Sequence, residues 1–282
     1  MTAPRDIKLL ISDVDGTLVP YDKTLSADAR AAAADLHRAG VGLALTSSRP
    51  PQGMRMLIEP LGLDLPLAGF NGGLIVDTKL NEIESHPIAP AAVEAALRML
   101  KDSGLDVWIY ADTGWFVTRA DGPHVARESW IVQLDPKIAA PAANGALGRV
   151  FKIVGVSDDY PKVAAVEAAV QRQLDGVASV FRSADHFLDV TDLKATKGCV
   201  ALSLARRLNL SRAQIASIGD SPNDVSMFRE SGFSIAMGNA SDEVKASADA
   251  VTDSNEHDGF AKAVRRFVLS LEPTEAEDRS PS

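Results

Sequence analysis

The chain has 282 residues, of which 46% are apolar and 24% are charged, and its formal net charge at neutral pH is -9. A chain of this length and composition can bury a substantial core and is expected to fold into two domains. The acidic balance argues against nonspecific binding of nucleic acid by the whole surface, because phosphate backbones attract clustered Lys and Arg. We attribute the acidity to solubility.

The sequence also argues against a membrane protein and against a fold that depends on disulfide bonds. The single cysteine, Cys199, cannot form an internal disulfide framework. Residues 1–6 are polar and lead into a short apolar run without a signal-peptide pattern. No apolar run approaches the roughly 20 residues needed to cross a bilayer. We therefore expect a cytoplasmic protein with no membrane role.

The first part of the chain alternates between predicted strands and helices. The apolar runs 7–11 and 41–46 are typical of strands buried on both faces of a parallel sheet. Between them, Ser26 is a suitable N-cap for a helix over residues 27–38, and Gly40 stands where a C-terminal cap is expected. The crossover of this βαβ unit should be right-handed.

Three more elements complete this first part. A second helix is predicted from Pro50 to about residue 59, because proline fits the first helical turn. A strand over residues 65–70 follows, and Asn71-Gly72-Gly73 predicts a tight structural turn into residues 74–77. We do not include this turn among the candidate site residues.

After residue 87 the pattern becomes that of a separate α+β insertion. Trp108 and Trp115 occupy strand positions and are expected to be core residues of this insertion. Its predicted elements are helices over residues 90–103 and 161–174, strands over residues 105–110, 115–118, 150–156, 177–181 and 187–190, and a loop over residues 136–148.

Strand and helix alternation resumes after residue 190. The predicted elements are helices over residues 197–208, 222–231 and 259–271 and strands over residues 215–218, 233–237 and 250–252. The predicted fold is a doubly wound, mainly parallel α/β sheet over residues 1–87 and 191–271, split by an α+β domain over residues 88–190. Residues 272–282 are charged, contain Pro and Ser, and are expected to be disordered.

Two carboxylates one residue apart, Asp13 and Asp15, follow the first predicted strand. Such a pair can hold Mg²⁺ through hard oxygen ligands and can present one carboxylate as a nucleophile. The same pattern also occurs in ordinary turns, where Asp bonds to the backbone and Gly takes a positive φ. The pair alone therefore indicates phosphoryl chemistry without deciding it.

Four polar segments fall where a doubly wound sheet binds ligands, at the carboxyl ends of strands or the starts of helices. They are residues 13–17, residues 46–49, the region of Lys197, and residues 219–224. Each can offer side chains and backbone N–H groups to an anion.

Each segment also has an ordinary structural interpretation. Asp220 could cap the helix that follows, and Ser47 and Ser48 could be turn hydroxyls. Lys197 could be a solvated residue, but a positive charge in the first turn of a helix is unfavourable against the helix dipole. That mismatch favours a functional Lys197.

Taken together, the motifs resemble those of the haloacid dehalogenase superfamily of phosphohydrolases, in particular the Cof-type branch with a type IIB cap. One departure is Ser48, where many relatives have Gly; a serine there still offers a backbone N–H to phosphate. The motifs are Asp13-Val14-Asp15-Gly16-Thr17-Leu18, Ser47-Ser48-Arg49-Pro50, Asn71-Gly72-Gly73, Lys197-Gly198 and Gly219-Asp220-Ser221-Pro222-Asn223-Asp224, in matching order and spacing.

The resemblance implies a role for each site residue. Asp13 would attack phosphorus and become an aspartyl-phosphate, while Asp15 would protonate the leaving alkoxide and then activate water. Mg²⁺ would be held by Asp13, by the backbone carbonyl of Asp15 and by Asp220. Asp224 could orient Lys197 or a metal-bound water. The phosphoryl oxygens would be held by the side chains of Ser47, Lys197 and Asn223 and by the backbone N–H groups of Val14 and Ser48.

We therefore expect a Mg²⁺-dependent phosphatase acting on a small phosphorylated metabolite, a sugar phosphate or polyol phosphate. A phosphomutase or phosphotransferase would use the same motifs. A catalytically silent metabolite-binding protein is less consistent with the sequence, because Asp13 and Asp15 are both present. Substrate specificity is expected from the cap, around residues 112–115 or 121–127, and neither nucleic acid nor membrane is an expected partner. The oligomeric state is left open.

Overall fold

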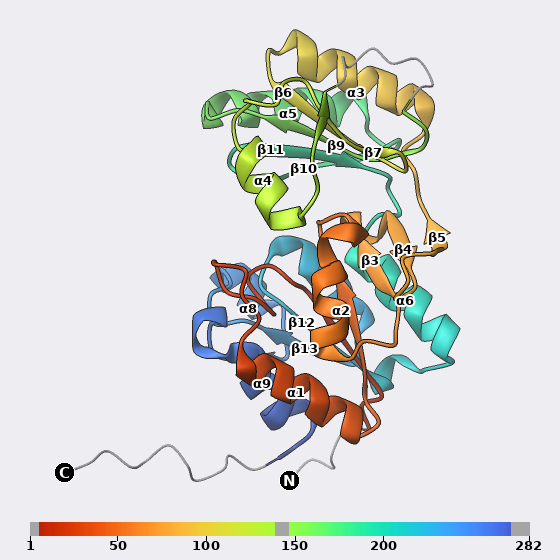
Figure 1. Ribbon diagram of the computed structural model, residues 1–282, viewed down its shortest axis with the longest axis vertical. Helices are drawn as coiled ribbons and strands as arrows, with labels where there is room; N and C mark the ends of the chain where they lie inside the picture. The colour runs from red at the N-terminus through yellow and green to blue at the C-terminus, as the bar shows by residue number, and fades with distance from the viewer. Residues whose placement is uncertain (1–5, 139–146, 272–282) are drawn as a thin grey trace, which may run out of the picture. The chain divides into compact units, whose positions relative to one another are not determined.

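The computed structural model describes residues 6–138 and 147–271 (Figure 1). The chain packs into two compact units. Unit 1 comprises Met1–Thr46, Met56–Pro66 and Lys197–Ser282, and unit 2 comprises Ser47–Arg55 and Leu67–Thr196. Within the described part of the chain, no helix is long and apolar enough to cross a bilayer. The domain limits expected from the sequence stay a prediction, and the expected tail over residues 272–282 lies outside the described residues.

The strands of unit 1 form a parallel sheet in the order β14-β13-β12-β1-β2. All four residues of β1 are buried, as the apolar run predicted for a strand covered on both faces. The sheet confirms the predicted parallel α/β class. Its strands are β1 (Leu9–Ser12), β2 (Gly42–Thr46), β12 (Ile215–Gly219), β13 (Phe233–Ala236) and β14 (Ala250–Val251).

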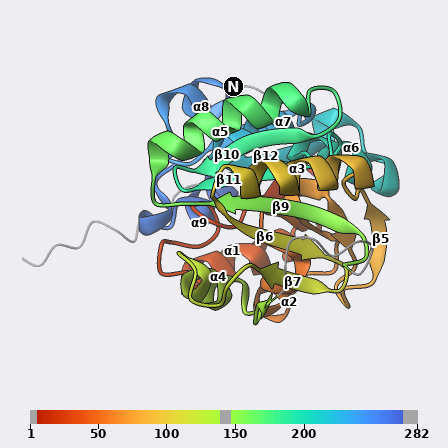
Figure 2. The same cartoon turned by 90° about the horizontal axis from the view of Figure 1, so that it is seen from above.

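Helices of unit 1 pack in two groups, α1 with α9 (Figure 1) and α6 with α7 (Figure 2). From β1 the chain crosses to β2 and from β12 to β13, in opposite directions along the sheet, so right-handed crossovers place α1 and α7 on opposite faces. Ser26 caps α1, as predicted, by accepting the N–H of Ala29. The helices are α1 (Ala27–Arg38), α2 (Arg55–Leu61, whose first residue belongs to unit 2), α6 (Lys197–Leu208), α7 (Val225–Glu230), α8 (Asp242–Ala246) and α9 (Gly259–Ala263), which continues as the π-helical η6 (Val264–Val268). Short 3-10 turns are η3 (Arg212–Gln214), η4 (Pro222–Asp224) and η5 (Asn255–His257).

Unit 2 is built on a six-stranded sheet in the order β10-β11-β9-β6-β7-β8, antiparallel except for the pair β7–β8. The strands are β6 (Asp106–Ala111), β7 (Gly114–Val117), β8 (Lys137–Ile138), β9 (Val150–Val156), β10 (Ser179–Ala184) and β11 (Phe187–Thr191). The same unit contains the short 3-10 turns η1 (Pro51–Met54) and η2 (Phe70–Gly72) and the antiparallel strands β3 (Leu67–Gly69), β4 (Leu74–Val76) and β5 (Glu82–Ser85).

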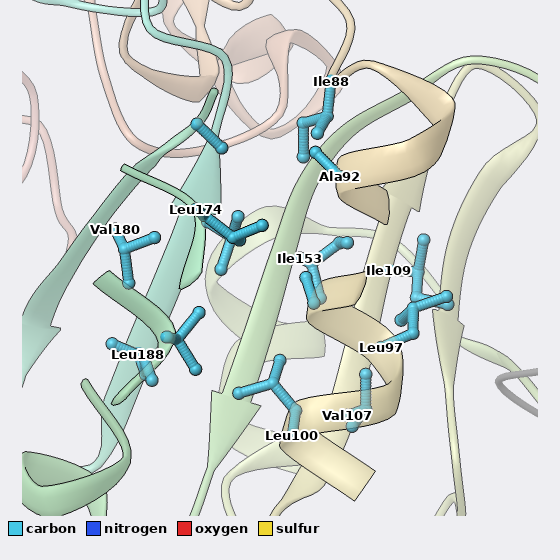
Figure 3. Packing of buried hydrophobic residues seen from close by; sticks show 14 of the residues in the cluster. Ile88, Ala92, Leu97, Leu100, Val107, Ile109, Ile153, Leu174, Val180 and Leu188 are labelled. Carbon is cyan, nitrogen blue, oxygen red and sulfur yellow. The ribbon is translucent and has the colours of Figure 1, made fainter. Parts of the chain in front are cut away.

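Helices α3 (Pro90–Asp102) and α5 (Tyr160–Gln173) cover one face of this sheet (Figures 1 and 2). Leu100 of α3 is fully buried in an aliphatic cluster with Ile153 and Leu188 of the sheet (Figure 3). Burial of such side chains is the main favourable contribution to the stability of the unit.

The opposite face of the sheet is aromatic and is bordered by α4 (Val125–Val132). Trp108 and Trp115 pack edge to face with ring centroids 5.4 Å apart, and Tyr110 stacks on Trp115 at 5.6 Å. Both tryptophans are buried, which confirms their prediction as core residues.

Several short elements differ from the sequence-based prediction. α4, α8, β5 and β8 were not predicted. His124 before α4 and Gln133 after it both take left-handed conformations. His124 provides no side-chain cap, and the Gln133 side-chain amide donates to the Trp130 carbonyl (2.6 Å). Neither residue type is a usual start or stop signal of a helix. The helix predicted from Pro50 is instead a 3-10 turn followed by α2, which tolerates Pro60 in its last turn. The predicted loop over residues 136–148 contains the short strand β8, and its residues 139–146 lie outside the described part.

Candidate active site

The predicted nucleophile lies directly after β1, an interior strand of the unit 1 sheet. Asp13 follows β1, and its N–H donates to the carbonyl of Ile218 in β12 (3.0 Å). The side chain is buried, with 5% of the residue exposed. The chain then turns at Gly16, which has φ 83°, and a Cβ atom added there would lie 2.4 Å from Asp220 Oδ2. Only glycine therefore fits between the first loop and Asp220.

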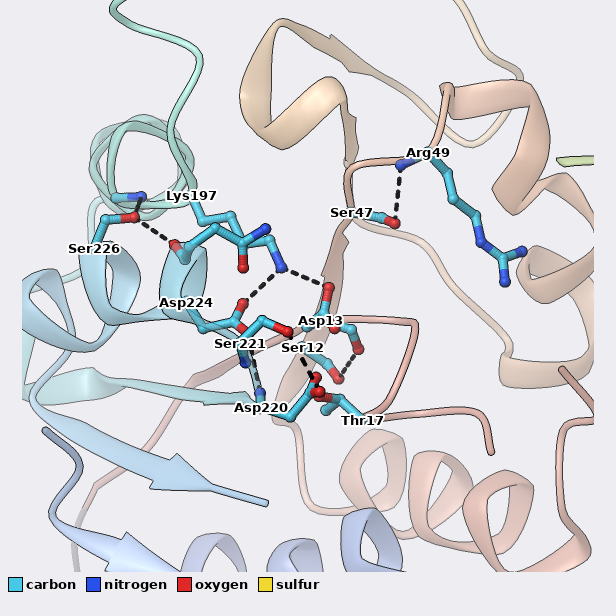
Figure 4. A network of polar contacts seen from close by, with 12 residues as sticks. Ser12, Asp13, Thr17, Ser47, Arg49, Lys197, Asp220, Ser221, Asp224 and Ser226 are labelled. Carbon is cyan, nitrogen blue, oxygen red and sulfur yellow. Dashed lines mark hydrogen bonds and ion pairs between the residues drawn. The ribbon is translucent and has the colours of Figure 1, made fainter. Parts of the chain in front are cut away.

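Lys197, the first residue of α6, bridges two carboxylates (Figure 4). Its Nζ lies 2.5 Å from Asp13 Oδ1 and 2.6 Å from Asp224 Oδ1, and the residue is 1% exposed. The start of α6 is held close to α7, because a Cβ atom on Gly198 would lie 2.8 Å from the carbonyl oxygen of Ser226. The close packing of α6 on α7 thus places the Lys197 ammonium group beside the two carboxylates.

The loop after β12 arranges the other two carboxylates (Figure 4). Asp224 Oδ2 accepts the backbone N–H groups of Asp220 (2.9 Å) and Ser221 (2.8 Å), so both oxygens of Asp224 are engaged. Asp220 Oδ1 accepts the Thr17 hydroxyl (2.9 Å), and Asp220 Oδ2 lies 3.4 Å from Asn239 Nδ2. The contacts of Asp224 fit the predicted orienting role toward Lys197.

Electrostatics of this cluster reflect burial and crowding. Burial raises the pKa of the Asp13 carboxyl well above its usual range; Lys197 opposes this shift, and the carboxylates of Asp224 and Asp220 add to it. Burial, with the Asp224 carboxylate, also raises the pKa of Asp220. For Lys197, burial would lower the pKa, but the carboxylates of Asp13 and Asp224 outweigh it and raise the pKa. The Lys197 ammonium group is therefore charged, and it is one positive charge beside the three carboxyl groups of Asp13, Asp220 and Asp224.

The acidic cluster has a donor set that could hold a metal ion. Asp13, Asp220 and Asp224 each offer a carboxylate oxygen, and these oxygens lie within 4.8 Å of one another. Oxygen-only donors suit hard divalent cations such as Mg²⁺. A divalent cation would also offset the repulsion that raises the pKa values of Asp13 and Asp220. The residues thus fit the metal implied by the sequence motifs.

The second carboxylate of the first motif has a partner that the sequence did not indicate. Asp15 Oδ1 lies 2.7 Å from Nζ of Lys23, in the loop between β1 and α1. Lys23 carries no motif signature, because its contact with Asp15 depends on how the loop folds back. The predicted metal contact of the Asp15 carbonyl and its acid–base role stay predictions.

Two further predicted phosphate ligands lie beside the carboxylates in sequence. Asn223 belongs to η4, is half-buried, and its carbonyl accepts the Ser226 hydroxyl (2.8 Å). Val14 is buried, and its carbonyl accepts the N–H groups of Leu18 and Val19, both at 3.0 Å. Phosphate binding by the Asn223 side chain and the Val14 N–H stays a prediction.

Ser47 and Ser48 belong to unit 2 and are placed by its own hydrogen bonds. The Ser47 hydroxyl accepts the N–H of Arg49 (3.1 Å; Figure 4), and the Ser47 carbonyl accepts the N–H of Asn71 (2.8 Å). Arg49 is buried and donates to the carbonyls of Gly53 and Ile131. The turn at Asn71 thus supports the Ser47 loop, although sequence reasoning left it out of the site. Phosphate binding by Ser47 and Ser48 stays a prediction.

Comparison with known proteins places the chain among hydrolases. A family model described as haloacid dehalogenase-like hydrolase matches residues 10–264. The 5-amino-6-(5-phospho-D-ribitylamino)uracil phosphatase YcsE of Bacillus subtilis is 28% identical over 265 residues, covering 94% of this chain and 97% of that protein.

Solved structures agree. A haloacid dehalogenase-like hydrolase from Bacteroides thetaiotaomicron has a TM-score of 0.83 at 26% identity and covers 92% of this chain and 99% of its own. A subclass IIB sugar phosphatase has a TM-score of 0.82 at 22% identity, and the match covers 93% of this chain and 99% of that chain. This likeness shows the shared fold. On this evidence the chain belongs to the haloacid dehalogenase-like hydrolases.

Proposed function

We propose that the protein is a Mg²⁺-dependent phosphatase that hydrolyses a sugar phosphate or polyol phosphate through an aspartyl-phosphate on Asp13. One observation carries the proposal: Lys197 joins the Asp13 and Asp224 carboxylates, with Asp220 beside them, at the carboxyl ends of β1 and β12. The proposed nucleophile, an ammonium group and two carboxylates that could hold a metal ion thus lie where doubly wound sheets bind ligands.

In the first step an oxygen of the Asp13 carboxylate forms a bond to phosphorus and the bond from phosphorus to the leaving oxygen breaks. Asp15 gives its proton to that oxygen, so the product leaves as an alcohol. Lys197 keeps Asp13 oriented and offsets negative charge on the phosphoryl oxygens. When bound, Mg²⁺ would supply charge compensation between Asp13 and the phosphate dianion.

In the second step Asp15, now a carboxylate, takes a proton from water while the water oxygen attacks phosphorus. The bond between phosphorus and Asp13 breaks, inorganic phosphate leaves, and both carboxyl groups return to their starting states. Ser47 and Asn223 would hold the phosphoryl oxygens during both steps, with the backbone N–H groups of Val14 and Ser48.

The substrate class is supported by one relative. YcsE, which is 28% identical over most of its length, is named for a substrate whose phosphate is carried by a ribityl chain. A ribityl phosphate is a polyol phosphate, the class that the sequence motifs led us to expect. We therefore place polyol and sugar phosphates first in a substrate screen.

The direct test is phosphate release from 4-nitrophenyl phosphate with and without Mg²⁺. We expect Mg²⁺-dependent release by the wild type and no release above background by Asp13→Asn. Asp253→Asn is a matched control, because Asp253 is an exposed carboxylate paired with Lys262. Equal rates for wild type and Asp13→Asn under every divalent metal would refute the proposal. Adding ribitol and measuring labelled phosphate on it separates hydrolysis from transfer.

A further inference from the structure

We propose that Lys23 is a positioning residue, which holds the Asp15 carboxylate in place for both proton transfers. The inference rests on the proposed function, because it assigns Lys23 a task through the acid–base role of Asp15. Lys23 itself is not assigned contact with the substrate.

The Lys23 ammonium group contacts the carboxylate of Asp15 directly. Lys23 Nζ lies 2.7 Å from Asp15 Oδ1, and the two side chains are 18% and 29% exposed. An ion pair shielded to this degree is less screened by water and salt than one on the open surface. The pair of Lys262 with Asp253, with side chains 46% and 56% exposed, illustrates the open-surface case in the same unit.

The backbone adopts an unfavourable conformation to make this contact. Lys23 has φ 63°, in the left-handed region that side chains other than Gly, Asn and Asp rarely occupy. Its N–H donates to the Pro20 carbonyl (3.0 Å), which closes the turn before Thr24. Such conformations persist only where surrounding contacts hold them, and they gather at functional sites.

Contacts from the C-terminal part of unit 1 hold the loop in this shape. The Tyr21 N–H donates to Glu256 Oε1 (2.9 Å), and Asn255 Nδ2 lies 3.4 Å from the Val19 carbonyl. Asn239 Oδ1 accepts the Asn255 N–H (3.0 Å), and Asn239 Nδ2 donates to the Gly16 carbonyl (2.9 Å). The loop is therefore anchored at Gly16, Val19 and Tyr21, between the two residues of the ion pair.

An anchored ammonium group restricts the carboxylate that it contacts. A proton can pass between Asp15 and the leaving oxygen, or between water and Asp15, only at hydrogen-bond distance. With Lys23 bound to Oδ1, the Asp15 carboxylate has fewer orientations available to it. Loss of Lys23 should therefore slow the steps that need Asp15 and spare those that do not.

Two substrates separate these steps. A nitrophenolate is stable enough to leave without a proton, whereas phenolate is more basic, with a pKa of about 10 for the phenol. Formation and breakdown of the phosphoenzyme are measured by rapid quench in single turnovers of 4-nitrophenyl phosphate and phenyl phosphate with Mg²⁺. The variants are Lys23→Met, Lys23→Arg and the control Lys262→Met, each with its thermal unfolding midpoint.

For Lys23→Met we expect phosphoenzyme formation from phenyl phosphate to fall roughly 10- to 100-fold, the range expected when a reacting group is misplaced by about 1 Å. Formation from 4-nitrophenyl phosphate should change less than about threefold, because it needs no acid. Breakdown should slow by the same factor for both substrates, since it needs Asp15 as base. Lys23→Arg should recover most of the rate, and Lys262→Met should match the wild type.

Two results would overturn the inference. Equal slowing of formation from both substrates, with breakdown unchanged, would show a general structural effect of Lys23. Rates of Lys23→Met equal to those of the wild type would show that the ion pair has no part in the reaction. With either result, a phosphoenzyme detected in the wild type would still support the proposed function. If the wild type formed no phosphoenzyme, both the proposed function and the role of Lys23 would be refuted.

Discussion

Replacing Thr17 by valine should weaken metal binding without unfolding the protein. Thr17 is 1% exposed, and its hydroxyl donates to Asp220 Oδ1 at 2.9 Å. Valine has nearly the same shape, so the change removes one hydrogen bond to a carboxylate and adds no bulk. Burial raises the pKa of Asp220, and the Thr17 hydroxyl opposes that shift. Its loss favours the protonated carboxyl, which cannot serve as a metal ligand.

The size of the effect follows from the value of one such bond. A hydrogen bond to a charged group contributes about 1.5–3 kcal/mol. Because about 1.4 kcal/mol corresponds to a tenfold change in an equilibrium constant, Thr17→Val should bind Mg²⁺ roughly 10- to 100-fold more weakly. The same range is typical when a group that orients a metal ligand is removed.

The assay is titration with Mn²⁺, followed by electron paramagnetic resonance, and competition by Mg²⁺, so that metal binding is measured independently of activity. Thr17→Ser keeps the hydroxyl and should retain most of the affinity. Thr252→Val is the matched control, because it also removes a buried threonine hydroxyl of unit 1, which donates to the Gly259 carbonyl (2.9 Å). An affinity of Thr17→Val within twofold of the wild type would refute this account of Asp220.

Three other changes test the packing and the charges. Gly198→Ala would force α6 away from α7, since the new Cβ would lie 2.8 Å from the Ser226 carbonyl oxygen; we expect a loss of about 1–3 kcal/mol in urea unfolding and a lower kcat. Leu100→Ala should leave a cavity in the aliphatic cluster of unit 2 and cost about 2–5 kcal/mol, with little change in Mn²⁺ affinity. Hydrogen bonds from Arg149 lower the pKa of Glu82 from 4.5 to about 2. Because the folded-state pKa is the lower one, this pair contributes above about pH 4.5 and loses its contribution as the pH falls toward 2. Glu82→Gln should therefore cost at most about 1 kcal/mol at pH 7, since the pair is partly exposed, and less at pH 3; an equal cost at both pH values would contradict this.

The sequence predicts the sheet of unit 1 and the position of its chemistry because both depend on local patterns. Apolar runs mark buried strands, and polar motifs directly after them fall at one edge of a parallel sheet. For this reason the sequence predicts that Asp13, Lys197 and Asp220 lie close together, and the structure brings them together with Asp224. The α/β class and the hydrolase family are confirmed.

Contacts made by loops could not be predicted in the same way. Lys23 contacts Asp15 from a backbone in the left-handed conformation. A lysine at that position gives no sequence signal for this conformation. Asn239 acts through a hydrogen bond to Gly16, more than 200 positions away in the chain. The helix α4 lacked capping signals at both ends. Each depends on tertiary contacts that hydrophobic periodicity does not encode.

The central claim, that Asp13 carries the phosphoryl group, can be tested chemically. The protein is mixed with 4-nitrophenyl phosphate and Mg²⁺, quenched in acid and treated with labelled borohydride, which reduces an aspartyl-phosphate to homoserine. Peptide mass spectrometry then locates the label. Our account predicts labelled homoserine at position 13 and none at positions 15, 220 and 224, with the label lost in Asp13→Asn. A label at another carboxylate, or phosphate turnover by the wild type with no label at all, would contradict it.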